Sequence, residues 1–183
     1  MFRSSHMKEE LTHKTLKELL TYNTATGVFI WNHRHLDYFK SHRLFKTFNT
    51  RFSGTKAGSI DKKGYILICI FGKLYSAHRL AWMYIHGSFP IDQIDHINSI
   101  TDDNRICNLR EANKSQNGQN QKKAHKYNSS GLLGVSFYKP LSKYRAQIRL
   151  KGKQKHIGYF NTPEEAHTAY IQAKRKYHEF GTL

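Results

Sequence analysis

Residues 94–120 read IDHINSITDDNRICNLREANKSQNGQN, and the expected architecture follows from this stretch. Gln93–Ile97 is expected to be a strand that carries the pair Asp95-His96, and the polar residues Asn98–Arg105 that follow are rich in turn formers. Leu109–Ala112 then returns as a second strand, and the polar residues after it suit a surface helix. The order of strand, loop, strand and helix predicts a compact ββα unit.

Four side chains of this stretch suit the hydrolysis of a phosphodiester. Carboxylate and amide oxygens are hard ligands for Mg²⁺ or Mn²⁺, so Asp95 and Asn117 are candidate metal ligands. A neutral imidazole beside such an ion can take a proton from water, which makes His96 the candidate general base. Asn108 can accept a hydrogen bond from the far imidazole nitrogen and so orient the ring without adding charge.

A structural interpretation of the same stretch stays open. Adjacent strand residues point to opposite faces, so Asp95 and His96 can share a site only where the strand ends or twists. Asparagine is also abundant between residues 98 and 128, and its side chain often satisfies backbone groups in turns. In that interpretation the stretch is an Asn-rich loop without catalytic function.

Charge and composition favour a polyanionic partner. The 183 residues include 30 Lys and Arg against 13 Asp and Glu, for a formal net charge of +17. Lysines kept for solubility are the alternative. No apolar run is long enough for a membrane span and no signal peptide is recognisable, so we expect a cytoplasmic protein without membrane contact. The opening MFRSSHM is expected to be disordered.

The two cysteines, Cys69 and Cys107, lie in different segments and form no CxxC pair. A structural zinc site of the cysteine type and a disulfide framework are therefore not expected. Their apolar neighbours predict buried thiols.

The first part of the chain combines regular and irregular patterns. Leucines at near-helical spacing in residues 11–22, with Thr12 or Thr15 as a cap, predict a helix, and Val28–Trp31 predicts a short strand. Residues 33–56 interleave basic and aromatic side chains, which predicts an irregular segment. Such a segment suits phosphate contact and base stacking, or equally a surface insertion whose aromatic side chains pack down.

A hairpin and a helix precede the ββα unit. Tyr65–Phe71 and Leu74–Ala77 flank a tight turn, which predicts two paired strands. His78–His86 has helical character and is ended by Gly87. The two histidines that bound this helix are expected to be structural or exposed rather than catalytic.

After a linker at Ala124–Ser130, the pattern predicts three antiparallel strands backed by one helix. The middle segment, Lys143–Lys151, alternates with a period of two and turns only Lys, Arg and Gln to one face. Thr162 and Glu165 form a capping box around Pro163, which predicts the start of the helix. The three strand segments are Leu133–Tyr138, Lys143–Lys151 and Gln154–Phe160.

The stretch at 94–120 closely resembles the HNH nuclease motif, in the variant common in phage- and intron-encoded homing endonucleases. The runs AHRLAWMYIHGSFP at 77–90 and LLTYNTATGVFIW at 19–31 extend the resemblance, while the segment at 33–58 is longer than the family usually carries there. By position, the resemblance implies the site set out above, in a ββα-metal (His-Me finger) fold. It also implies products with 5′-phosphate and 3′-hydroxyl ends.

Residues 130–180, with LLGVSFY, KYRAQIRLKGKQKHIGYF and TPEEAHTAY, resemble the ethylene-response-factor (APETALA-two) DNA-binding domain. That domain lays its three-stranded sheet in the major groove, so the resemblance places Arg145, Gln147 and Arg149 against base edges. A polar strand that only faces solvent is the alternative. Four lysines better suit phosphate groups: Lys139, Lys151, Lys153 and Lys155.

Together these inferences predict an α+β protein in three parts: an N-terminal helix, strand and irregular basic-aromatic segment at 1–58, an HNH core at 59–125 and a sheet-plus-helix DNA-binding domain at 126–183. We expect a site-specific endonuclease that cuts double-stranded DNA with one Mg²⁺ or Mn²⁺ per active site and no small-molecule cofactor. A monomer would nick one strand in a phage-infected bacterium, and a dimer would be needed to cut both. The alternatives are a non-catalytic DNA-binding regulator that uses the C-terminal sheet, and a basic RNA- or ribosome-associated protein.

Overall fold

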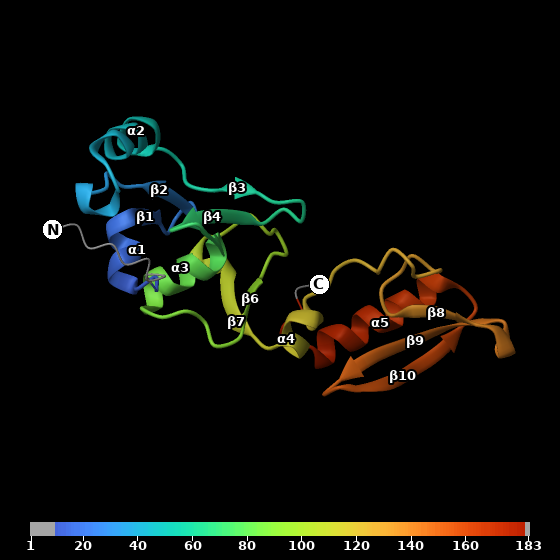
Figure 1. Cartoon of the computed structure of the whole chain (residues 1–183). Coiled ribbons are helices and arrows are strands. Elements are labelled where there is room, and N and C mark those ends of the chain that lie inside the picture. The colour runs from blue at the N-terminus through green and yellow to red at the C-terminus, as the bar shows by residue number, and fades with distance from the viewer. Residues whose placement is uncertain (1–9, 182–183) are drawn as a thin grey trace. The chain divides into compact units, whose positions relative to one another are not determined.

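The computed structural model describes residues 10–181, which form two compact units of mixed helix and strand (Figure 1). The first unit holds the described residues up to His96 together with Ile100–Glu111, and the second holds Ile97–Ser99 and the chain from Ala112 onward. The predicted α+β class is confirmed. The opening MFRSSHM lies outside the described residues. Within residues 10–181, none of the helices has the length and apolar character needed to cross a membrane.

The first unit begins with a short helix and a hairpin: α1 (His13–Leu19), β1 (Leu20–Asn23) and β2 (Val28–Trp31). The Oγ1 atom of Thr12 accepts a hydrogen bond from the backbone N–H of Thr15 at 3.1 Å, so the predicted cap is present. The leucines of α1 and β1 are fully buried and join the main core of the unit.

The segment predicted to be irregular contains η1 (Leu36–Tyr38) and an eleven-residue helix, α2 (His42–Phe52), so that prediction was wrong. Ser41 caps the helix, because its Oγ accepts a hydrogen bond from the backbone N–H of Leu44 at 3.3 Å. Three phenylalanines at helical spacing are partly buried and give the helix a packed side: Phe45, Phe48 and Phe52.

A three-stranded antiparallel sheet and a helix complete the first core. The strands are β3 (Ser59–Ile60), β4 (Ile66–Ile70) and β5 (Lys73–Ser76), in that order across the sheet. Helix α3 (Ala77–His86) follows and ends at Gly87, which adopts the left-handed conformation at φ 85°. The predicted hairpin, helix and stop residue are confirmed.

Both cysteines are exposed, which corrects the expectation of buried thiols. Cys69 lies between Ile68 and Ile70, whose side chains are fully buried. Side chains alternate along a strand, so Cys69 points to the face opposite its two buried neighbours and is exposed there.

The ββα order is confirmed in the stretch that carries the candidate site. Strands β6 (Gln93–His96) and β7 (Leu109–Ala112) pair with one another, with η2 (Ile106–Asn108) before β7. Helix α4 (Lys114–Gln119) follows, and Asn113 and Gln116 form a capping box at its start. At this position an asparagine does satisfy backbone groups, as the structural interpretation expected.

The second unit contains the predicted sheet, in the order β10-β9-β8, and the predicted helix. Thr162 and Glu165 form the expected capping box, and the helix packs on one face of the sheet through Ala166 against Val135 and Ala146. Close to it, Gly134 leaves so little room that a Cβ atom there would lie 2.0 Å from the ring of Tyr170. The elements are β8 (Val135–Tyr138), η3 (Lys139–Leu141), β9 (Lys143–Leu150), β10 (Lys153–Phe160) and α5 (Pro163–Tyr177).

Helix α4 belongs to the second unit, because side chains around its end contact α5 and the residues after it. The ammonium group of Lys174, only 1% exposed, donates a 2.6 Å hydrogen bond to the carbonyl of Gln121. The backbone N–H of Phe180 donates to Oε1 of Gln119 at 3.3 Å. The last change from the first unit to the second therefore falls between Glu111 and Ala112, ahead of the expected linker.

Candidate active site and DNA-binding face

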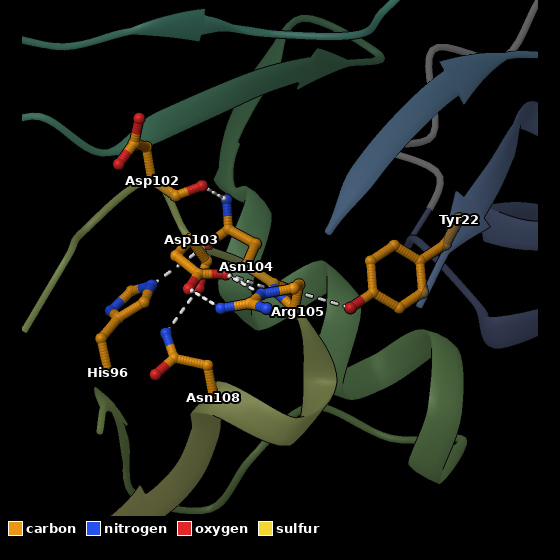
Figure 2. A network of polar contacts seen from close by, with 7 residues as sticks. All are labelled: Tyr22, His96, Asp102, Asp103, Asn104, Arg105 and Asn108. Carbon is orange, nitrogen blue, oxygen red and sulfur yellow. Dashed lines mark hydrogen bonds and ion pairs between the residues drawn. The ribbon is translucent and has the colours of Figure 1, made fainter. Parts of the chain in front are cut away.

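Asp95 and His96 lie at the C-terminal end of β6, where the constraint of strict alternation ends. Both residues are only 5% exposed. Nε2 of His96 lies 3.2 Å from Oδ1 of Asn104 (Figure 2). Since an amide oxygen can only accept, this bond assigns the proton to Nε2 and the lone pair to Nδ1. His96 is thus held in a tautomer that a general base can use.

Asn104, which its sequence context does not single out, is the central residue of this network. It is fully buried, and its Nδ2 donates to the carbonyl of Asp102 at 3.3 Å, so its oxygen is the atom turned toward His96. The hydroxyl of Tyr22 donates to the Asn104 carbonyl at 2.6 Å, which joins the first hairpin to the loop (Figure 2). Burial raises the pKa of Tyr22 to about 12, so this hydroxyl keeps its proton.

The loop also requires a glycine in the first hairpin. Gly27 has φ +73°, and a Cβ atom there would lie 2.5 Å from the backbone nitrogen of Arg105. Glycine alone combines that conformation with such a close approach of two backbones. The two segments are far apart in sequence, so the local pattern indicates a turn at this position but not its contact with the site.

Asn108, the predicted partner of the base, is buried at the end of η2. Its Nδ2 donates to the backbone carbonyl of Asp103 at 2.8 Å, which braces the loop that carries Asn104 (Figure 2). The carboxylate of Asp103 in turn binds Arg105 through two hydrogen bonds, at 2.8 and 2.6 Å. The orienting role of Asn108 at His96 stays a prediction.

Two aromatic rings from other elements pack against the candidate base. The ring of His78, on α3, lies 5.1 Å from that of His96, and Tyr65 lies 5.9 Å from it. Nδ1 of His78 is buried without a hydrogen-bond partner among the described atoms. His78 was expected to be structural or exposed, and its ring contact with His96 was not predicted.

Burial sets the charge state of both histidines. Desolvation lowers the pKa of His78 to about 4, and the neighbouring His96 contributes to the shift. Desolvation also holds the pKa of His96 below its ordinary value, although Asn104 and the nearby aspartates oppose the shift. Both imidazoles are therefore neutral at neutral pH, and a neutral imidazole is the form that accepts a proton.

Asp95 is paired with an arginine that was not among the predicted site residues. Nε and Nη2 of Arg110 donate to the same carboxylate oxygen of Asp95, at 2.9 and 2.7 Å. Arg110 lies on β7, the partner strand of β6, so the pairing of the strands brings the two side chains together. The carboxylate of Asp95 is buried and Arg110 is partly exposed, and this ion pair compensates the charge of Asp95.

The candidate metal ligands offer oxygen atoms only. Asn117 lies on α4, in the second unit, whereas Asp95, His96 and Asn108 lie in the first. Across residues 10–181, no cluster of three or more His, Cys, Asp or Glu side chains is placed to hold a metal ion. Mg²⁺ is commonly held by one or two carboxylates together with water and substrate phosphates, so one carboxylate and one amide oxygen fit Mg²⁺ or Mn²⁺ better than zinc.

In the second unit, β9 presents the predicted alternation. Ala146 and Ile148 are buried toward α5, whereas Arg145, Gln147 and Arg149 alternate with them on the opposite side. We call this side the open sheet face. Its residues are those three, their cross-strand partners, and a tyrosine in ring contact with that group: Ser136, Tyr138, Arg145, Gln147, Arg149, Gln154, His156 and Tyr159.

Aromatic rings that were not predicted from the sequence surround Arg145 on the open sheet face. The guanidinium lies 5.4 Å from the ring centre of Tyr138, and the Tyr138 and Tyr159 rings lie 5.1 Å apart. A β-bulge between His156 and Gly158 breaks the alternation of β10. Because of this bulge, His156 and Tyr159 share a face, with their rings 4.5 Å apart.

The four lysines predicted to contact phosphates are all exposed, but they occupy different places. Lys155 is opposite Ile148 in the sheet, and its ammonium lies 4.9 Å from the ring centre of Tyr177 on α5. Lys153 is opposite Leu150 and so also lies on the α5 side. Lys139 begins η3, and Lys151 lies in the turn between β9 and β10. Their phosphate contacts stay predictions.

Comparison with known proteins bears on the first of these two sites. No curated protein and no solved structure matched the chain. A family model described as HNH endonuclease matches residues 75–119, a segment that begins in β5 and ends with α4. All four predicted catalytic and metal-binding residues lie within it. Residues 75–119 are thus similar to an HNH endonuclease domain, which supports a nuclease that hydrolyses DNA.

Proposed function

We propose that this protein is a site-specific, metal-dependent endonuclease of the homing type that hydrolyses double-stranded DNA. One observation carries the proposal: a buried, neutral His96, held by Asn104 next to Asp95, inside the segment that matches the HNH endonuclease family. A general base needs both the tautomer and the neutral state.

In the proposed reaction, Nδ1 of His96 takes a proton from a water molecule as its oxygen bonds to phosphorus. The bond from phosphorus to the 3′-oxygen breaks, and that oxygen takes a proton from a second water molecule, which leaves 5′-phosphate and 3′-hydroxyl ends. Asn104 holds the ring through Nε2, and Asn108 is proposed to assist in its orientation. Held by Asp95 and Asn117, one Mg²⁺ or Mn²⁺ would supply positive charge to the phosphate oxygens.

The second unit is proposed to select the DNA sequence, as an ethylene-response-factor type domain. Arg145, Gln147 and Arg149 on the open sheet face would read base edges in the major groove. Lys139, Lys151, Lys153 and Lys155 would contact phosphates. With one candidate base per chain, a monomer would nick one strand at a time.

Replacing His96 with alanine tests the proposal directly. We expect His96→Ala to lower the rate of nicking of a supercoiled plasmid by at least about 100-fold, because general-base catalysis typically contributes that much. DNA affinity, measured by fluorescence anisotropy in EDTA, should stay within about twofold, and EDTA should abolish nicking by the wild-type protein.

His86→Ala is the matched control, because it removes another histidine of the first unit, one that is exposed and packs beside Trp82. That variant should nick at the wild-type rate. A His96→Ala protein that nicks as fast as the wild type in Mg²⁺ would overturn the proposed mechanism.

The second candidate function is a DNA-binding regulator without catalysis. It is favoured by the open sheet face, which combines cations and aromatic rings and needs no active site to bind DNA. Metal-dependent nicking that disappears in Asp95→Ala would exclude it. The absence of any nicking under all metal conditions would favour it over the nuclease.

A further inference from the structure

Helix α2 has two sides of different character. Phe45, Phe48 and Phe52 form the packed side, where Phe48 contacts Phe52 and Trp31. The opposite side carries exposed residues at the spacing i, i+3, i+4, i+7 and i+8, which places them along one stripe. We call this stripe the α2 cationic face: Arg43, Lys46, Thr47, Thr50 and Arg51.

Within residues 10–181, no acidic side chain forms an ion pair with the cations of this face. No Asp or Glu occurs between Tyr38 and Ile60 in the sequence. Arg51 lies over the ring of Phe52 at 5.1 Å. Five exposed positions therefore offer three positive charges and two hydroxyl groups.

A face kept only for solubility would be built differently. Charged surfaces of that kind mix both signs, and like charges three or four positions apart destabilise a helix by about 0.2–0.5 kcal/mol. Arg43 and Lys46 stand three positions apart, without an acidic neighbour to offset their repulsion. A bound polyanion would offset that repulsion, so the charge of this face favours a negatively charged partner.

The aromatic side chains of α2 do not take part in this face. Arg34, a cation of the same segment, lies 4.0 Å from the ring centre of Phe48 and 4.6 Å from that of Trp31. Burial lowers the pKa of Arg34 to about 10, so it stays charged, but it serves to hold the helix to β2. Base stacking by this segment is therefore not expected, and phosphate contact alone fits the exposed groups.

We propose that the α2 cationic face binds the phosphate backbone of the duplex DNA substrate, as a contact separate from the open sheet face. This rests on the proposed function in so far as duplex DNA is the substrate. From Arg43 to Arg51 the helix advances roughly 12 Å, a length of duplex that carries about three phosphates on each strand. Arg, Lys and Thr are side chains that commonly bind those oxygens. The contact adds affinity without reading sequence.

The salt dependence of binding tests this contact. Affinity of the full chain for a duplex oligonucleotide is measured in EDTA over a range of salt concentrations, for the wild type and for Arg43→Gln/Lys46→Gln/Arg51→Gln. Each lost phosphate contact lowers the slope of log affinity against log salt by about 0.9, so we expect a decrease of about 2 to 3. Sequence preference should not change. EDTA prevents cleavage, so failure here does not depend on the nuclease mechanism, which the His96→Ala assay tests.

Two controls separate the contact from general charge and from misfolding. Lys14→Gln/Lys62→Gln/Lys63→Gln removes the same charge at exposed positions elsewhere and should lower the slope less. Arg43→Lys/Arg51→Lys keeps the charge and should keep the slope. Equal losses in the two triple variants, or an unchanged slope in the α2 variant, would overturn the proposal. So would competition by structured RNA as strong as that by duplex DNA.

Discussion

Helix α2 and strand β9 are built from similar side chains, yet they present them in different ways. Both combine aromatic or aliphatic residues with Arg and Lys. On α2 the aromatic rings point to the protein and the cations stand alone on the outside. On the open sheet face of β9, Arg145 is surrounded by the rings of Tyr138 and Tyr159 and by Ser136.

Spacing, rather than composition, therefore decides which chemistry faces the solvent. Helical spacing places Phe45, Phe48 and Phe52 on one side of α2. Their rings therefore pack toward the protein and are not part of the α2 cationic face. A period of two leaves every second residue of β9 outside, and neighbouring strands add aromatic rings to them. An isolated cation can bind phosphate, whereas a cation held among rings and hydroxyls can be oriented toward a base edge.

The largest expected effect is a loss of stability in the second unit alone, caused by a substitution where its sheet packs against α5. Gly134→Ala would place a Cβ atom inside the ring of Tyr170 at φ +77°, so we expect the second unit to lose about 3 kcal/mol of stability. Hydrogen exchange of β8–β10 amides should accelerate. Both tryptophans lie in the first unit, so the unfolding transition of that unit, followed by tryptophan fluorescence, should stay in place.

Gly152→Ala separates the clash from the backbone conformation. Gly152 has φ +80°, but no atom lies within 4 Å of the position that a Cβ would occupy, so only the conformational cost of about 1 kcal/mol is expected. If Gly134→Ala and Gly152→Ala have the same stability, the packing of Gly134 on Tyr170 is not what supports the sheet.

A more moderate change tests the orientation of α2. Phe48→Ala removes contacts with Trp31, Phe39 and Phe52, so we expect the first unit to lose about 2 kcal/mol. The measurement is the urea midpoint of tryptophan fluorescence. Leu44 is 50% exposed on the same helix, and Leu44→Ala should change stability by less than about 0.5 kcal/mol. The reverse order would mean that α2 packs by another side.

The weakest change concerns the open sheet face. Arg145→Ala should reduce discrimination at one base position by about tenfold, or about 1.4 kcal/mol, as measured by competition between a randomised duplex library and its selected site. Lys153→Ala, on the α5 side, should weaken all sequences together and lower the salt slope by about 1. Loss of affinity without a change of preference in Arg145→Ala would show that this face does not read bases.

Local patterns carried the predictions that the structure confirmed. The capping box of Thr162, the stop at Gly87 and the alternation of β9 each depend on residues a few positions apart. Helix α2 depends on equally local spacing, but its cations and aromatic rings alternate so closely that the pattern resembles that of an irregular segment. The cap at Ser41 is the signal that identifies the helix.

The candidate site was predicted less completely, because its supports come from distant segments. Asp95, His96 and Asn108 follow from spacing within one motif. The contacts of Asn104 with Tyr22 and of His96 with His78 depend on how hairpin, helix and loop pack, which spacing alone does not determine. Cys69 illustrates the same limit for burial, since its apolar neighbours predicted the opposite of its exposure.

The contacts of Lys174 and Phe180 with residues at the end of α4 have a consequence for protein engineering. A chimera that exchanges the chain after the 124–130 linker would separate the Gln119 side chain and the segment that supplies the Gln121 carbonyl from Phe180 and Lys174. A junction after Glu111 preserves these contacts. The residue at position 117, which is a proposed metal ligand in this chain, would then come from the donor protein. An exchange at the linker would therefore divide the second unit itself, because α4 and the residues after it make their contacts inside that unit.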